Sequence, residues 1–176
     1  LEAMNIPIEE QAGFEADDLL ATMAVTAAGN GDEVIIVTGD RDIYQMVKDP
    51  HIRVLYNRRG VSDYALYDEA GIAERTGVTP DLYPQYAALR GDPSDNLPGV
   101  PGVGEKTAAK LINKYGGLDG IFEHVDEQTP KLKSNLIEHE ERARRNLQAM
   151  VLRVDAPVAL DVGELRWGEV NVDEVQ

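Results

Sequence analysis

The feature that most constrains the fold is a run of five residues, Val34 to Thr38, that is apolar and β-branched almost throughout. Such a run favours a buried strand of a parallel sheet. A helical pattern from Glu15 to Ala28 precedes it, and Gly29-Asn30-Gly31 ends that pattern. A short helix, Asp42 to Val47, and a second strand, Ile52 to Tyr56, follow. This alternation predicts an α/β fold with a parallel sheet and right-handed crossovers.

The remainder of the chain is predicted to be mostly helical. Helical patterns, the first interrupted by Gly77 and Pro80, cover residues 67–89, 105–115, 118–125 and 130–152. The segment from Gly91 to Gly104 is dense in glycine and proline and is expected to be irregular. From Asp155 the periodicity is lost. We therefore expect part of an α/β core in residues 1–90, a helical subdomain in 91–154 and an acidic tail or linker in 155–176.

Composition narrows the possible functions. The 176 residues include no cysteine, which excludes disulfides and thiolate zinc sites. The sequence contains no apolar run of about 18 residues, so no membrane partner is expected, and a cytoplasmic location fits. The net charge of −15 argues against nucleic-acid binding unless positive charge is concentrated locally.

Three clusters of carboxylates carry the chemistry. They are Glu15-Ala16-Asp17-Asp18 at a helix start, Thr38-Gly39-Asp40-Arg41-Asp42 after the apolar strand, and Gly91-Asp92-Pro93-Ser94-Asp95-Asn96 in the irregular segment. Asp40 and Asp42 lie at the carboxyl end of a strand, where open α/β sheets bind ligands, and two-residue spacing can point both to one side of an extended segment. Carboxylates gathered in this way need cations, and Mg²⁺ or Mn²⁺ suits oxygen ligands. Two such ions can hydrolyse a phosphodiester.

Each cluster also has a purely structural interpretation. The acids of the first cluster can complement a helix dipole. Asp40 can cap the helix that follows it, and Asp92 can serve as a turn residue. Taken together the metal interpretation is favoured, because every cluster adjoins a buried element or a strand end.

The most specific string runs from Leu97 to Ala108, Leu-Pro-Gly-Val-Pro-Gly-Val-Gly-Glu-Lys-Thr-Ala. It is not a P-loop, since Glu105 separates the last glycine from Lys106 and no strand precedes it. It fits a helix-hairpin-helix turn, in which Gly102 and Gly104 let a phosphate approach free N–H groups at a helix start.

Positive charge adjoins this turn. Lys106, Lys110 and Lys114 recur every four residues and form a basic stripe on one helix face. The same spacing is common on any solvated helix, but the glycine pattern favours DNA binding. Arg58-Arg59-Gly60 is expected in a loop after the second strand, and the arginines near residue 144 are expected on solvated surface.

The three acidic motifs and the hairpin, in this order, resemble the 5′-nuclease family, which includes flap endonucleases and the N-terminal domain of bacterial DNA polymerase I. The resemblance covers residues 1–154 and is nearest to the polymerase I branch. It implies a parallel-sheet 5′-nuclease (PIN-like) core followed by a helical helix-hairpin-helix DNA-binding subdomain. It also implies that the family's first strand and basic helical arch are absent from this chain.

The resemblance implies residue roles as well. Catalytic acids that hold one metal, directly or through water, would be Glu15, Asp17, Asp18 and Asp40; the second metal position would be served by Asp42, Asp92 and Asp95. The hairpin would bind K⁺ through backbone oxygens and grip duplex DNA with Gly102, Gly104, Lys106, Thr107 and Lys110.

The implied activity is 5′–3′ exonuclease and flap endonuclease hydrolysis of DNA in replication and repair. The implied partners are 5′ flaps, nicks or duplex ends and a C-terminal polymerase domain, and the implied location is the nucleoid. Three alternatives stay open: a toxin-like ribonuclease, a non-catalytic duplex-binding helix-hairpin-helix module, and a domain that Ca²⁺ or Mg²⁺ merely stabilises.

Overall fold

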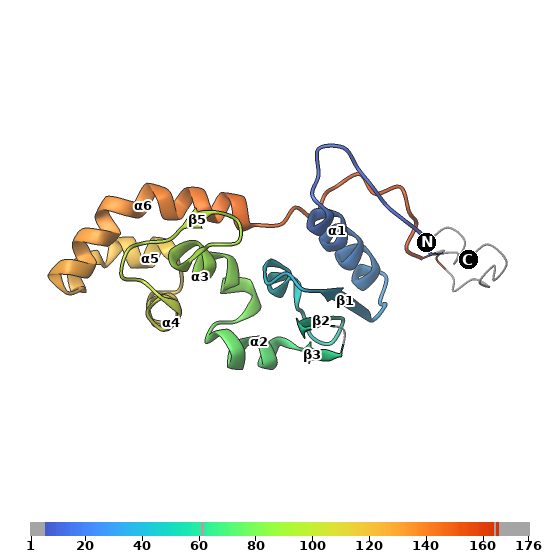
Figure 1. Ribbon diagram of the computed structural model, residues 1–176, viewed down its shortest axis with the longest axis horizontal. Helices are drawn as coiled ribbons and strands as arrows, with labels where there is room; N and C mark the ends of the chain where they lie inside the picture. Colours follow the sequence, from blue (N-terminus) through green and yellow to red (C-terminus); the bar gives the residue numbers. More distant parts are fainter. Residues whose placement is uncertain (1–5, 61, 164, 166–176) are drawn as a thin grey trace. The chain divides into compact units, whose positions relative to one another are not determined.

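The computed structural model describes residues 6–60, 62–163 and 165 (Figure 1). The chain forms two compact units, one from residues 1–34 with 153–176 and the other from residues 35–152. Each unit has its own internal contacts.

The first unit is built on helix α1, Ala16–Gly29. Glu15 caps this helix in a capping box: its side chain accepts the Asp18 N–H, and Asp18 accepts the Glu15 N–H. The chain returns to α1 after Arg153, where the Ala156 N–H donates to the Thr22 hydroxyl over 3.1 Å. Ala156 is buried there. The start of the predicted tail therefore packs on α1, whereas residues 166–176 lie outside the described residues.

The second unit contains a three-stranded sheet in the order β1 (Val34–Thr38), β2 (Ile52–Arg59) and β3 (Asp63–Tyr67). Strands β2 and β3 form an antiparallel hairpin in which Val54 lies opposite Tyr67. This hairpin was not predicted. Arg58 and Arg59 were expected in a loop, but they end β2, and the chain turns at Gly60, whose φ is +58°.

Strand β1 has the predicted bounds but not the predicted burial. Ile36 is 4% exposed, while Ile35 and Val37 on the opposite face are 50% and 60% exposed. The expectation of a strand buried on both faces is therefore wrong for the described residues. A short apolar run fixes strand formation, but its sequence cannot tell whether a second layer covers the other face.

Tyrosines form the centre of this unit. Tyr44 lies in η2 (Asp42–Met46), which is a 3₁₀ turn rather than the predicted helix. Its ring meets those of Tyr56, Tyr67 and Tyr83 edge-on, with centroids 5.3, 5.7 and 5.4 Å away. Edge-to-face packing of this kind adds to the gain from burial. The cluster joins η2, the β2–β3 hairpin and the helices that follow into one core.

The helices after the sheet largely match the expected pattern. They are α2 (Glu69–Thr76), η3 (Pro80–Leu82), α3 (Tyr83–Arg90), α4 (Glu105–Tyr115), α5 (Leu118–Glu123), η4 (Val125–Glu127) and α6 (Pro130–Met150). Helix α6 packs along α3, as Figure 1 shows. In the described part of the chain, no helix has the length and apolar character needed to cross a bilayer.

Between α3 and α4 the chain forms a two-residue ribbon of β4 (Gly91–Asp92) and β5 (Leu97–Pro98). The backbones cross so closely that a Cβ on Gly91, whose φ is +81°, would collide with the Gly99 backbone. A Cβ on Gly99 would collide with the Arg90 carbonyl in turn. Both glycines are therefore required by the close approach.

Asn146 of α6 should be a large contributor to the stability of the second unit. Its buried amide donates to the Ala88 and Pro98 carbonyls, over 3.2 and 3.0 Å, and thereby joins α6 to α3 and β5. Asn146→Ala leaves two carbonyls without this donor, so we expect a loss of about 2–4 kcal/mol in the free energy of unfolding. Urea unfolding followed by circular dichroism measures it. The control is Asn113→Ala, which removes one exposed bond to the Gly77 carbonyl and should cost about 1 kcal/mol or less; equal losses would contradict the prediction.

Candidate metal centre and nucleic-acid interface

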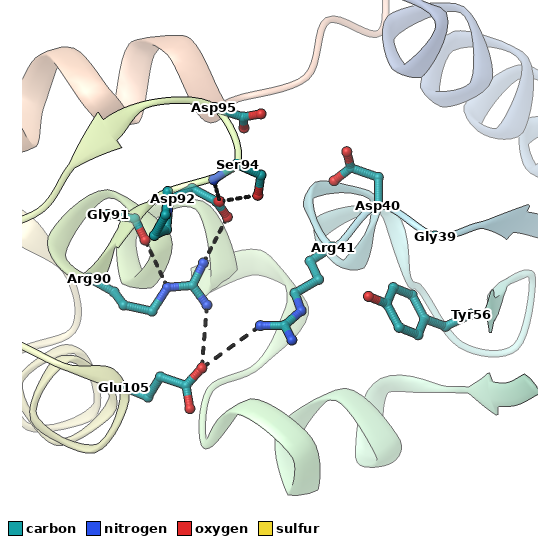
Figure 2. Close-up of a pocket in the computed structure, with 11 residues that line it drawn as sticks. Gly39, Asp40, Arg41, Tyr56, Arg90, Gly91, Asp92, Ser94, Asp95 and Glu105 are labelled. Atoms are coloured by element: carbon teal, nitrogen blue, oxygen red, sulfur yellow. Dashed lines mark hydrogen bonds and ion pairs between the residues drawn. The ribbon is translucent and has the colours of Figure 1, made fainter. Parts of the chain in front are cut away.

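Three of the predicted carboxylates of the second unit, Asp40, Asp92 and Asp95, line one cavity of about 640 Å³ (Figure 2). Asp40 comes from the loop after β1, and the other two come from the loop between β4 and β5. The lining also includes Arg41 and Arg90. The cavity therefore combines acids with guanidinium groups, at the end of β1 where the sequence predicted a site.

The Asp40–Asp42 segment is a turn and not the extended stretch that was expected. The Asp40 side chain accepts the Asp42 N–H over 2.8 Å, and the Asp40 N–H donates to the Thr38 hydroxyl. Aspartate readily captures an N–H two residues ahead, which bends the chain. Arg41, rather than Asp40, is the N-cap of η2, so the capping interpretation of Asp40 is wrong, although one of its oxygens accepts a backbone N–H.

The acids of this unit influence one another electrostatically. Burial, and after it the charges of Asp40, Asp95 and Asp92, together raise the pKa of Asp42 from 3.8 to about 7. Burial also raises the pKa of Asp95, again with help from Asp92 and Asp40. This mutual repulsion is what a bound cation would relieve.

Asp92 behaves differently because it has strong partners. Burial raises its pKa, but hydrogen bonds from Ser94 and the charges of Arg90 and Arg41 outweigh burial, so the pKa is lowered overall. The Arg90 guanidinium donates to Asp92 over 3.0 Å and to the Gly91 carbonyl over 2.9 Å. Asp92 is consequently held as a carboxylate at neutral pH.

The donor chemistry suits a hard divalent ion, since every candidate ligand is a carboxylate oxygen. However, among the residues that the structure describes, no three Asp, Glu or His side chains converge closely enough to form a ready metal-binding group. The metal-ligand set therefore stays a prediction.

The first predicted cluster belongs to the other unit. Glu15 and Asp18 form the capping box of α1, and Asp18 Oδ1 also accepts the Arg153 N–H over 2.9 Å. Asp17 follows Glu15 in the first turn of the helix. The structural interpretation of this cluster is correct as far as the contacts go, and its metal role stays a prediction.

The hairpin has the features expected of a phosphate-binding turn. Gly102 has a φ of +80°, and Asn135 holds the turn by donating to the Pro101 carbonyl over 2.7 Å. Gly104 is the N-cap of α4 and carries no side chain to cover the first N–H groups of that helix. Buried Ala108 lets α4 pack closely. The N-terminus of α4 is therefore open to an anion.

The basic stripe is shorter than predicted. Lys106 and Lys110 are exposed and Thr107 is half-buried. Lys114 instead donates to Glu127 over 2.9 Å and to the Tyr115 hydroxyl over 2.7 Å. Two lysines, rather than three, are thus presented beside the hairpin turn.

Sequence reasoning missed the polar groups that organise the cavity. Arg41 and Arg90 both approach Glu105, the first residue of α4, with nitrogen–oxygen distances of 3.8 Å (Figure 2). Arg90 lies over the Tyr86 ring and is largely buried. No signal in the sequence marks these contacts, because the burial of Arg90 is visible only in the structure.

The raised pKa of Asp42 has a consequence for stability. Between pH 3.8 and about 7 the folded state binds more protons than the unfolded state, so stability falls as the pH rises through this range. Asp42→Asn should therefore raise the free energy of unfolding by about 1–2 kcal/mol at pH 8 and change it little at pH 4.

Urea unfolding in EDTA at the two pH values measures this difference. Asp32→Asn, which changes an exposed residue between α1 and β1, is the control and should show no such pH dependence. An equal effect of Asp42→Asn at both pH values would contradict burial of a charged carboxylate.

Two family models match consecutive parts of the chain. The model described as the 5′-3′ exonuclease N-terminal resolvase-like domain matches residues 1–77, and that of the 5′-3′ exonuclease C-terminal SAM fold matches residues 78–173.

Relatives support the same family. A DNA polymerase I of Mycobacterium leprae is 47% identical over 99% of this chain, and a 5′-3′ exonuclease of Streptomyces coelicolor is 50% identical over 75% of it. The chain spans 19% of the length of the first and 43% of the second.

Solved structures show the same fold. A T5 5′-exonuclease with bound divalent metal ions (zinc) is 25% identical, with a TM-score of 0.70 over 78% of this chain and 50% of that one. The catalytic core of Rad2 in complex with DNA is 18% identical, with a TM-score of 0.65 over 98% of this chain and 57% of that one, and so shows likeness of fold. Together with the family models, these findings confirm the resemblance and the predicted fold class, and the chain belongs to the 5′–3′ exonuclease family.

Proposed function

We propose that the protein containing this chain is a metal-dependent 5′–3′ exonuclease and flap endonuclease that hydrolyses DNA phosphodiesters. The observation that carries the proposal is the electrostatic coupling of four acids, three of which, Asp40, Asp92 and Asp95, line one cavity. Together with burial, their charges raise the pKa of the half-buried Asp42 to about 7. Acids kept in mutual repulsion beside an open cavity are typical of a functional site rather than of a solvated face.

The carboxylates would hold divalent ions. Asp40 is assigned to one metal position, and Asp42, Asp92 and Asp95 are assigned to the second, with Glu15, Asp17 and Asp18 joining the first. Mg²⁺ or Mn²⁺, when bound, supplies Lewis acidity and activates water for attack on phosphorus. Arg90 contributes by keeping Asp92 ionised and by fixing its direction through two hydrogen bonds.

The hairpin would bind the duplex beside the cut. The N–H groups at the start of α4 can donate hydrogen bonds to a backbone phosphate, and the exposed Lys106 and Lys110 lie on the same helix. Gly102, Gly104 and Thr107 shape this surface, and backbone oxygens of the turn would hold K⁺. The sites of DNA contact are thus concentrated in one part of an otherwise acidic chain.

The wider assignments follow from the relatives. The partners would be 5′ flaps, nicks or duplex ends, at the nucleoid in the cytoplasm, and in the whole protein a polymerase domain, as the name of the Mycobacterium leprae relative indicates. The division at residues 90 and 154 is proposed as the boundary between the nuclease core, the hairpin subdomain and the tail.

A second function, a duplex-binding module without catalysis, is favoured by one observation. The hairpin is complete, while the described carboxylates do not form a three-ligand metal group. Cleavage and metal dependence distinguish the two functions.

We expect cleavage of a 5′-labelled flap duplex in Mg²⁺ or Mn²⁺ and none in EDTA. Asp40→Asn and Asp92→Asn should each lower kcat by roughly 10²-fold or more, because each removes a negatively charged carboxylate that would hold a metal ion. Denaturing gels measure the rate of product release. Asp32→Asn serves as the matched control and should cut at the parent rate. Metal-independent binding without cleavage by the parent protein would establish the binding module instead.

Duplex binding in EDTA tests the hairpin separately. Lys106→Ala and Lys110→Ala should each weaken binding uniformly across sequences and reduce the salt slope by about 1, because each removes one phosphate contact. Lys114→Ala should have a smaller effect, since Glu127 already pairs with Lys114. Fluorescence anisotropy over a range of KCl concentrations measures both quantities, and identical slopes for all three variants would contradict the assignment.

A further inference from the structure

A second, smaller cavity of about 130 Å³ lies beside the carboxylate-lined one in the same unit. The two share Arg41, Arg90 and Glu105, but the smaller cavity also has Arg75 and Tyr83 in its wall. Its charged lining consists of three arginines and one glutamate, so its formal charge is +2 in a chain whose net charge is −15. Such a local excess of positive charge suits an anion.

Surrounding contacts fix the guanidinium groups of this cavity. Arg75 donates through Nε to the Tyr44 hydroxyl over 3.1 Å and lies over the Tyr56 and Tyr67 rings. Arg90 lies over the Tyr86 ring and donates to the Gly91 carbonyl. A guanidinium group has five N–H donors, so each of these arginines retains further donors for a ligand. Donors held in place lose little entropy when an oxyanion binds.

Tyr83 provides the observation that points directly to a ligand. Tyr83 lines the cavity and is only 1% exposed. Its hydroxyl is buried and has no hydrogen-bond partner among the described residues. A buried hydroxyl without a partner destabilises the folded state and is rare in folded proteins. An oxygen acceptor in the cavity would satisfy it.

Glu105 shows where such an acceptor would lie. Its Oε1 is 3.8 Å from Nη1 of Arg41 and 3.8 Å from Nη1 of Arg90, so one carboxylate oxygen faces both guanidinium groups (Figure 2). The contacts are long and the Glu105 side chain is 66% exposed, so it can turn into solvent. A stronger oxyanion would replace it.

We propose that this cavity, formed by Arg41, Arg75, Arg90 and the Tyr83 hydroxyl, binds a single phosphoryl oxyanion in competition with the Glu105 carboxylate. The volume of about 130 Å³ leaves room for one tetrahedral group. The group is either a phosphate at the end of a DNA strand or free phosphate. The first source rests on the proposed nuclease function, and the second does not.

Inorganic phosphate binding to the protein, measured by isothermal titration calorimetry in EDTA, tests the site without catalysis or metal. Tyr83→Phe should weaken binding roughly tenfold, because it removes the hydroxyl that would donate a hydrogen bond to the charged phosphate. Arg75→Gln should weaken it at least as much, and Glu105→Gln should strengthen it, because the competing carboxylate is lost.

Matched controls are Tyr64→Phe and Arg145→Gln, which change an exposed tyrosine and an exposed arginine outside the cavity. Both should bind phosphate as the parent does, and circular dichroism should show every variant to be folded. Absence of phosphate binding by the parent overturns the proposal. So does an equal loss in Arg75→Gln and Arg145→Gln, or an unchanged affinity in Tyr83→Phe, which removes a single atom and is the variant least able to disturb folding.

Two further arms identify the source of the phosphate. In the first arm, a 5′-phosphorylated duplex binds more tightly than its 5′-hydroxyl counterpart, and Tyr83→Phe abolishes the difference. This result assigns the site to a strand end. Phosphate binding that does not compete with DNA assigns it to the free ion, and both results support the site. Phosphate binding by a protein that never cleaves DNA would count against the nuclease function alone.

Discussion

The arrangement of charge in the larger unit depends on the guanidinium group of Arg90. It is largely buried, lies over the Tyr86 ring, and donates to the carboxylate of Asp92 and to the Gly91 carbonyl. Burial raises the pKa of Asp92, but hydrogen bonds from Ser94 and this cation lower it overall, whereas burial and the neighbouring acids raise the pKa of Asp42. Two acids of the same group of carboxylates therefore differ in protonation behaviour because their partners differ.

The aromatic core adjoins that guanidinium group, because Tyr83 packs against Tyr86, over which Arg90 lies. The rings of Tyr56, Tyr67 and Tyr83 pack against that of Tyr44, and the hydroxyls of Tyr44 and Tyr67 accept hydrogen bonds from arginines. Arg75 lies against the same cluster. Burial of large rings stabilises the core, while the hydroxyls and ring faces provide partners for arginines. Stability and the polarity of the cavities thus come from the same side chains.

Local sequence patterns predicted the elements whose ends are marked by local chemistry. The bounds of β1 and α4 were predicted correctly, the latter because Gly104 and Gly116 delimit it. The β2–β3 hairpin was missed because Tyr64 and Leu66 are exposed, so its alternation does not mark a buried face. The roles of Arg90, Glu105 and Tyr83 could not be predicted, because they depend on contacts between segments distant in the sequence. The seven predicted metal ligands and the five hairpin residues stay predictions.

The crossing of Gly91 and Gly99 has a mechanical consequence. There is no room for even a methyl group between the strand that begins the Asp92 loop and the strand that leads to the hairpin turn. The two backbones therefore cannot slide past each other, and any displacement of the turn is transmitted to Asp92 over a very short path. Under the proposed function, a duplex that displaced the hairpin would therefore also displace the segment that carries this carboxylate.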